Sequence, residues 1–191
     1  YAHDLTYPAD SHFGDVELRD AIKNQKFGGD AYSFNRMSWI KPNFLWTMYR
    51  AGWASKPGQE RILAIKLPLS CFLEILEDAV HTSYIHGNYE NTEAWKQELL
   101  SHEVRIQWDP DHNPYGKKKE RKAIQLGMKG EILKKFATEM IAEIKDVTDF
   151  VSKEKTKIDT AGLDDLKVPQ ERIFDAIDDS LKFKLGVSKK N

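Results

Sequence analysis

The sequence lacks the features that mark several common classes of protein. Its single cysteine, Cys71, excludes a disulfide within the chain and a cysteine-based zinc site. None of its apolar runs approaches the roughly 18 residues that a membrane span needs. It contains no glycine-rich phosphate loop, nucleophile elbow or kinase signature. Any ligand or reaction must therefore be inferred from less familiar patterns.

The chain also lacks an excess of charge of either sign. It has 29 Lys and Arg residues against 30 Asp and Glu residues, which argues against bulk electrostatic binding to nucleic acid or to a membrane surface. The balance of charges does not exclude a local basic patch. One cysteine suits a reducing compartment, so we expect a soluble, cytoplasmic protein that does not associate with membranes. Because the sequence begins at Tyr1, a removed secretion signal also stays open.

The length and periodicity of the sequence predict one compact α+β domain. A chain of 191 residues can bury a sizeable core without disulfide or metal staples. Alternating and helical apolar patterns succeed each other, which predicts a mixed or antiparallel sheet flanked by helices. We expect strands at 1–7, 33–41, 61–67, 104–108, 123–127 and 146–151. We expect helices at 15–27, 43–52, from 70 to about 80, 92–101, 130–144 and 170–181.

A change of composition divides the chain near its C-terminal end. Residues 1–151 carry the predicted strands and most of the helices. From residue 152 the sequence becomes polar and charged, which is typical of a linker. The segment 170–181 then presents Ile173, Phe174, Ile177 and Leu181 at helical spacing. We therefore expect 152–191 to be a linker followed by an amphipathic helix that packs on the same domain.

Three segments of the sequence carry a resemblance to a known family. The main block reads RMSWIKPNFLW at 36–46, MYRAGW at 48–53 and KPGQE at 56–60. Two shorter pieces follow, QWDPDH at 107–112 and AIQLG at 123–127. In order and spacing these segments resemble the family catalogued as domain of unknown function 4291, over roughly residues 10–150. The resemblance implies a shared fold and surface but no established activity. At its start the chain departs from the family, whose usual Val-Tyr-Gln-Ala-Tyr strand corresponds only loosely to 1–7.

Four cations are concentrated in the main block. Arg36, Lys41, Arg50 and Lys56 lie within a short stretch in which Glu60 is the only acidic residue that balances them. Cations interleaved with aromatic rings suit a ligand that has phosphates and a flat ring. The alternative is a set of solvated or ion-paired side chains. We interpret the pattern as a site for a phosphate-bearing nucleotide or nucleic acid.

Three of the five tryptophans fall in the same block. Trp39, Trp46 and Trp53 have a structural interpretation as core residues, which the sequence favours for Trp39 and Trp46, because large aromatic residues dominate core energetics. The functional interpretation is a wall on which a base or nicotinamide ring stacks. We assign that role to Trp39 or Trp53.

Polar residues outside the cations complete the candidate site. Gln59 and Glu60 end a Pro-Gly loop before a buried strand, where a carboxylate can bind a ribose hydroxyl or act as a general base. An ion pair of Glu60 with a neighbouring arginine is the plainer alternative. Gln107 and Asp109 are candidate ligand contacts. The two aspartates around Pro110 fit turn chemistry better than a metal site, so we expect no metal.

The expected order of elements is also similar to ADP-ribosyltransferase-like folds. In those folds a strand carrying His or Arg is followed by a helix, and a glutamate at a strand edge completes an NAD site. On this fold-level analogy, Arg36 would bind phosphate or ribose and Glu60 would polarise the ribose. The implied activity is transfer of ADP-ribose or a related group from NAD to protein or nucleic acid. Two alternatives stay open: a small ribonuclease-like enzyme acting on RNA, and a non-catalytic module that binds nucleotide or nucleic acid.

Overall fold

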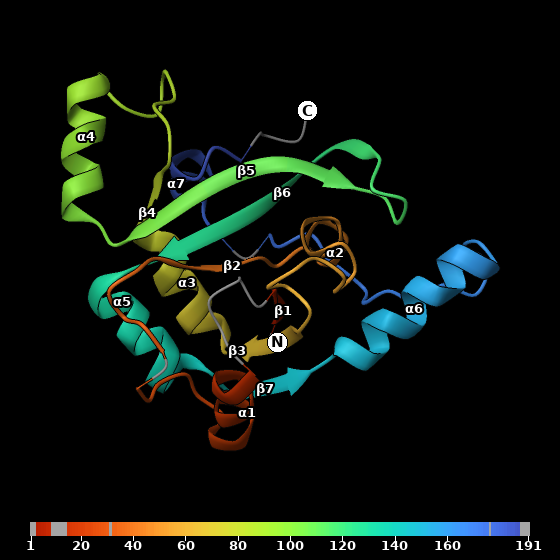
Figure 1. The fold of residues 1–191 in the computed structure, drawn as a ribbon. Helices are drawn as coiled ribbons and strands as arrows, with labels where there is room; N and C mark the ends of the chain where they lie inside the picture. Colours follow the sequence, from red (N-terminus) through yellow and green to blue (C-terminus); the bar gives the residue numbers. More distant parts are fainter. Residues whose placement is uncertain (1–2, 9–14, 31, 176, 188–191) are drawn as a thin grey trace.

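The computed structural model describes residues 3–8, 15–30, 32–175 and 177–187, with side chains from residue 18 onward. The described chain forms two sheets with helices around them (Figure 1). In the described part, no helix is both long enough and apolar enough to cross a membrane. The strands are β1 His3–Pro8, β2 Ser38–Ile40, β3 Ile62–Leu67, β4 Ala79–His81, β5 Val104–His112, β6 Lys118–Met128 and β7 Glu143–Asp146. The helices are α1 Asp15–Asn24, α2 Phe44–Ala51, α3 Leu69–Glu77, α4 Thr92–Ser101, α5 Gly130–Lys135, α6 Thr148–Thr160 and α7 Asp179–Lys184, with a π-helical turn at Phe136–Met140.

The two sheets have different strand orders. The three-stranded sheet has the order β1-β3-β7 and is antiparallel throughout. The four-stranded sheet has the order β2-β6-β5-β4, in which only the β4–β5 pair is parallel. Helices and strands are thus combined in one α+β domain with a mixed sheet, which confirms the fold class predicted from the sequence.

The main hydrophobic core joins the inner faces of both sheets. Ile65 of β3 and Ile106 of β5 are fully buried in the same cluster as Leu133, Phe136 and Met140. The helical stripe that begins at Leu133 therefore packs on the sheets, as its spacing predicts. Ile62 of β3 belongs to a second cluster between α2 and α6.

Several expected boundaries are wrong. The helix expected from 70 to about 80 ends at Glu77, before β4, and the strand expected at 104–108 continues to His112 through the segment expected as a turn.

The largest differences follow residue 135. The predicted helix 130–144 ends early, because a π turn follows α5 and the backbone is extended at Ile141. Ile144 therefore lies in β7, where it pairs with Ile65 of β3. In the predicted strand 146–151, Asp146 is the last residue of β7, and the residues from Thr148 onward begin α6. An apolar residue every three or four positions fits a helix, yet the same residues also serve a turn and a short strand.

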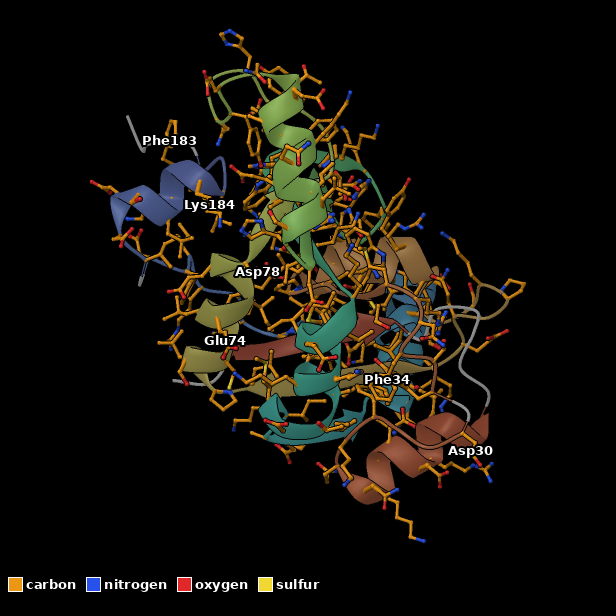
Figure 2. All side chains as sticks on the ribbon, turned by 90° about the vertical axis from the view of Figure 1, so that its left-hand side faces the viewer. Asp30, Phe34, Glu74, Asp78, Phe183 and Lys184 are labelled. Carbon is orange, nitrogen blue, oxygen red and sulfur yellow. The ribbon has the colours of Figure 1, made fainter. Side chains whose placement is uncertain are left out.

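The C-terminal segment also differs from its prediction. The stretch expected as a linker begins with α6, and helical structure in the predicted helix 170–181 is confined to α7 and its cap. The part before α7 contacts the domain at several residues, including the ring of Phe174 against Phe72 at 5.6 Å. In Figure 2, α7 with Lys184 lies beside the upper end of α3, and the Lys184 ammonium donates to the Glu77 carbonyl. The segment thus wraps around the domain.

The start of helix α2 is anchored by the side chain of Glu171 and by the side chain of its own N-cap residue, Asn43. The carboxylate of Glu171 accepts the Phe44 N–H at 2.8 Å and an N–H of Arg121 at 2.8 Å. Asn43, at the N-cap position, does not cap its own helix. Its side-chain oxygen accepts the Ile124 N–H of β6 at 3.1 Å. An orphan donor at the helix start is therefore satisfied by the C-terminal segment.

We expect Phe136→Ala to lower the free energy of unfolding by about 3–5 kcal/mol, because the Phe136 ring is fully buried and truncation leaves a cavity. Urea denaturation measures the change. The matched control is Leu100→Ala, since Leu100 is 78% exposed and its truncation should cost no more than about 0.5 kcal/mol. Equal effects of the two substitutions would contradict this placement of the core.

Candidate functional site

Three neighbouring strands direct polar side chains to the same face of the four-stranded sheet. Opposed residues in paired strands share a face, and the register aligns Trp39 with Gly127, Gly127 with Arg105, and Gln107 with Gln125. The opposite face carries core residues such as Ile106. This core face is turned toward α7, which lies behind β5 in Figure 1. We call the first surface the polar sheet face. Its members are Trp39, Lys41, Arg105, Gln107, Asp109 and Gln125.

Asp109 lies at the centre of a side-chain network on the polar sheet face. Its Oδ1 accepts a hydrogen bond from the Gln107 amide at 3.1 Å, and its Oδ2 accepts one from the Gln125 amide at 2.9 Å. All three side chains are only partly buried. An ionised carboxylate only accepts hydrogen bonds, so it holds the NH2 end of each amide toward itself. Two amides from adjacent strands are thereby fixed in orientation.

The indole of Trp39 lies over Gly127 of the adjacent strand. A Cβ placed on Gly127 would come within 2.8 Å of Trp39 Cε2 and Cζ2 and within 2.6 Å of Met37 Sδ. Gly127 is absent from the described residues with positive φ, so the glycine supplies space rather than an unusual backbone conformation. Trp39 is therefore held close to the sheet while part of its ring stays exposed.

Two cations at the ends of the polar sheet face are largely buried. Lys41 is 4% exposed, and its ammonium lies 6.0 Å from the Trp46 ring centroid. The guanidinium of Arg105 donates to the carbonyls of Leu99, His102 and Val104. Burial lowers the pKa of the Arg105 guanidinium, and the negative charge of the nearby Asp78 partly offsets this lowering. Arg105 thus ties the end of α4 to β5.

The cations at the end of α2 have a structural role. The Lys56 ammonium donates to the carbonyls of Tyr49 at 3.2 Å and Arg50 at 2.6 Å. A cation at these carbonyls satisfies acceptors left over at a helix C-terminus. The same ammonium lies 5.7 Å from the Tyr49 ring centroid. Arg50 is exposed beside it.

The remaining candidates are not members of the polar sheet face. Trp53 is buried in the second cluster, edge-on to Phe44 at 6.0 Å, so its ring belongs to the core. Gln59 and the exposed Glu60 lie in the loop before β3, in the other sheet, and within the described ranges Glu60 makes no hydrogen bond or ion pair. Arg36 is partly buried in the segment that leads into β2.

The structure therefore brings together four of the residues nominated from the sequence. By strand register, Trp39, Gln107 and Asp109 share one face, although they come from segments far apart in the sequence. Lys41 follows Trp39 by two residues, just beyond β2, so alternation assigns it to the same face. Gln125 was not nominated, yet it completes the Asp109 network. Its signal was present in the alternation of the AIQLG strand, where one residue faces the core and the next faces outward. Among the described residues, no group of three or more His, Cys, Asp or Glu side chains is placed to hold a metal ion.

His112 lies at the far end of β5, beneath the aromatic end of α2. Its ring stacks on Tyr49 with 3.6 Å between centroids and 9° between planes. The imidazole is 2% exposed, and neither ring nitrogen has a well-formed hydrogen bond among the described residues. Burial lowers the pKa of His112, and the nearby Asp111 carboxylate offsets part of this effect. The folded protein therefore favours the neutral ring.

We expect Gly127→Ala to lower the free energy of unfolding by about 1–3 kcal/mol, because the added methyl overpacks the contact with Trp39 and Met37. Urea denaturation measures the effect. The control repeats the substitution in a Met37→Ala, Trp39→Leu background, where the new methyl has room and should cost less. The same cost in both backgrounds would show that the contact does not set the requirement for glycine.

We expect His112 to make stability depend on pH. Because its folded pKa is lowered, the unfolded chain takes up the proton first, so stability is fully present above the unfolded pKa of about 6.5 and falls as pH decreases. Melting temperatures between about pH 7.5 and pH 5.5 should fall less for His112→Phe, which keeps an aromatic ring on Tyr49. The exposed His86→Phe serves as control and should follow the wild type. A His112→Phe profile parallel to the wild type would contradict the assignment.

Comparison with known proteins places this geometry in a family. No curated protein matches the sequence. The model of one family, described as a domain of unknown function (DUF4291), matches residues 16–174. The match includes α2 and all strands of the polar sheet face. Because it covers most of the 191 residues, the chain belongs to the DUF4291 family.

Proposed function

We propose that the polar sheet face binds a nucleotide, and that the protein uses NAD or a related nucleotide as the donor in a group transfer to protein or nucleic acid. The observation that carries the proposal is the position of the partly exposed Trp39 indole beside the amide–carboxylate network of Asp109. Nucleotide sites combine an aromatic surface for the base with a few fixed polar groups.

The spacing of these groups suits a nucleotide base. Gln125 lies two residues along β6 from Gly127, the residue beneath Trp39, which corresponds to about 7 Å along the strand. Gln107 lies opposite Gln125 on the neighbouring strand, about 5 Å away across the sheet. The glutamine side chains would therefore have to bridge the remaining distance to the edge of a base stacked on the indole.

The phosphates have a candidate partner at the start of β2. Arg36 precedes Trp39 by three residues, so no more than about 10 Å of chain separates them. This length matches the reach from a base to the phosphates of the same nucleotide. A guanidinium binds phosphate through two parallel charge-assisted hydrogen bonds, which makes Arg36 the proposed phosphate contact.

The chemical step assigned to this site is cleavage of the bond between nicotinamide and ribose in NAD. An acceptor nucleophile forms the new bond to the ribose carbon, its proton passes to a base or to solvent, and nicotinamide departs. Glu60 is the carboxylate proposed to polarise a ribose hydroxyl. It is exposed and without a partner among the described residues. Because it precedes β3 in the other sheet, this role requires a ligand that extends from the polar sheet face to the loop before β3. If Glu60 has no role in turnover, the site describes a non-catalytic nucleotide-binding module.

We expect Trp39→Leu to weaken binding of NAD about five- to hundredfold, because base stacking contributes ~1–3 kcal/mol. Calorimetric titration of the folded variant measures the change. The control is Tyr115→Leu, since Tyr115 is an exposed aromatic residue in the β5–β6 turn and should have no effect. Glu60→Gln should bind NAD as the wild type does and release less nicotinamide in a chromatographic assay. Unchanged NAD binding by Trp39→Leu would reject this site.

A further inference from the structure

Asp109 determines which atoms of the two amides remain for a ligand. Each glutamine uses one N–H on the carboxylate, so each keeps its carbonyl oxygen and its second N–H for another partner. If either amide were reversed, its carbonyl oxygen would face an Asp109 oxygen, and no hydrogen would lie between these two acceptors. The network therefore presents two donor–acceptor pairs, from Gln107 and Gln125, at fixed positions beside Trp39.

The charged groups that recognise guanine are already occupied on this face. A guanidinium reads guanine O6 and N7, and a carboxylate reads its N–H groups. Arg105 directs its guanidinium to the carbonyls of Leu99, His102 and Val104. Both oxygens of Asp109 accept from the glutamines. Guanine bound here would lack the guanidinium contact to its O6 and N7, and its N–H groups would meet neutral glutamine carbonyls in place of a free carboxylate.

Adenine matches the groups that remain. Its N6 amine donates while the adjacent ring nitrogen accepts, and a glutamine amide pairs with both atoms at once. A purine also covers more of the Trp39 indole than the single ring of a pyrimidine does. We propose that the polar sheet face is an adenine-recognition site in which Gln107 and Gln125 contact the base and Asp109 is a positioning residue. The inference rests on the proposed nucleotide binding and adds the identity of the base.

The test is a calorimetric titration of AMP, GMP, CMP and nicotinamide mononucleotide against the wild-type chain. AMP should bind about five- to hundredfold more tightly than GMP, because one bidentate amide contact discriminates by ~1–3 kcal/mol. Nicotinamide mononucleotide, which lacks adenine, should bind no better than CMP. Equal affinity for AMP and GMP would overturn the adenine assignment and leave nucleotide binding standing. No binding of AMP, GMP or NAD would overturn both.

Variants distinguish the residues proposed to contact the base, Gln107 and Gln125, from Asp109, the residue proposed to position them. Gln107→Leu and Gln125→Leu should each weaken AMP while leaving GMP almost unchanged. Asp109→Asn should reduce the ratio of AMP to GMP affinity, because an amide at this position no longer holds both neighbours in one orientation. The control is Gln97→Leu, an exposed glutamine on α4, which should keep the wild-type ratio. A wild-type ratio in folded Asp109→Asn would reject its positioning role, and a wild-type ratio in both glutamine variants would reject the proposal.

Discussion

The antiparallel pairing of β5 with β6 is the constraint on which both faces of the four-stranded sheet depend. Its register places Ile106 opposite Leu126 on the core face and Gln107 opposite Gln125 on the polar sheet face. A shift of one residue would exchange the two faces of a strand, burying amides and exposing apolar side chains. Burial of the core residues therefore selects the register that also brings Gln107, Asp109 and Gln125 together. Correct folding of the sheet and correct arrangement of the candidate site thus require the same strand pairing.

The two faces are organised by different kinds of contact. On the core side, apolar packing tolerates the choice between similar hydrophobic residues. On the polar sheet face, Asp109 accepts two hydrogen bonds and Gly127 gives space to one indole, so each position depends on particular atoms. Such directional contacts pre-organise a surface, because the side chains need not be ordered again when a ligand binds. This contrast is the physical basis for placing recognition on the outer face.

The sequence predicted the fold class and four of the six members of the polar sheet face, for reasons visible in particular residues. Alternation in β5 and β6 and the helical stripe from Leu133 follow local periodicity, which is why the core was predictable. The family block nominated Trp39 and Lys41, but only strand register shows that they share a face with Gln107. Sequence proximity also grouped Trp53 with them, although it packs in another cluster. Pairing between distant strands is invisible in a single sequence, and α6 was missed because its polar surface resembles a linker.

The contacts that anchor α2 affect when this helix can form fully during synthesis of the chain. Phe44 leaves the ribosome long before Glu171, the residue that satisfies its N–H, and Asn43 is bonded to a strand that is synthesised about eighty residues later. A nascent chain that ends in the middle of the sequence therefore lacks both anchors. The first turn of α2 therefore reaches its final arrangement only after Glu171 has emerged, so a structure near the start of the sequence depends on a residue that is synthesised much later.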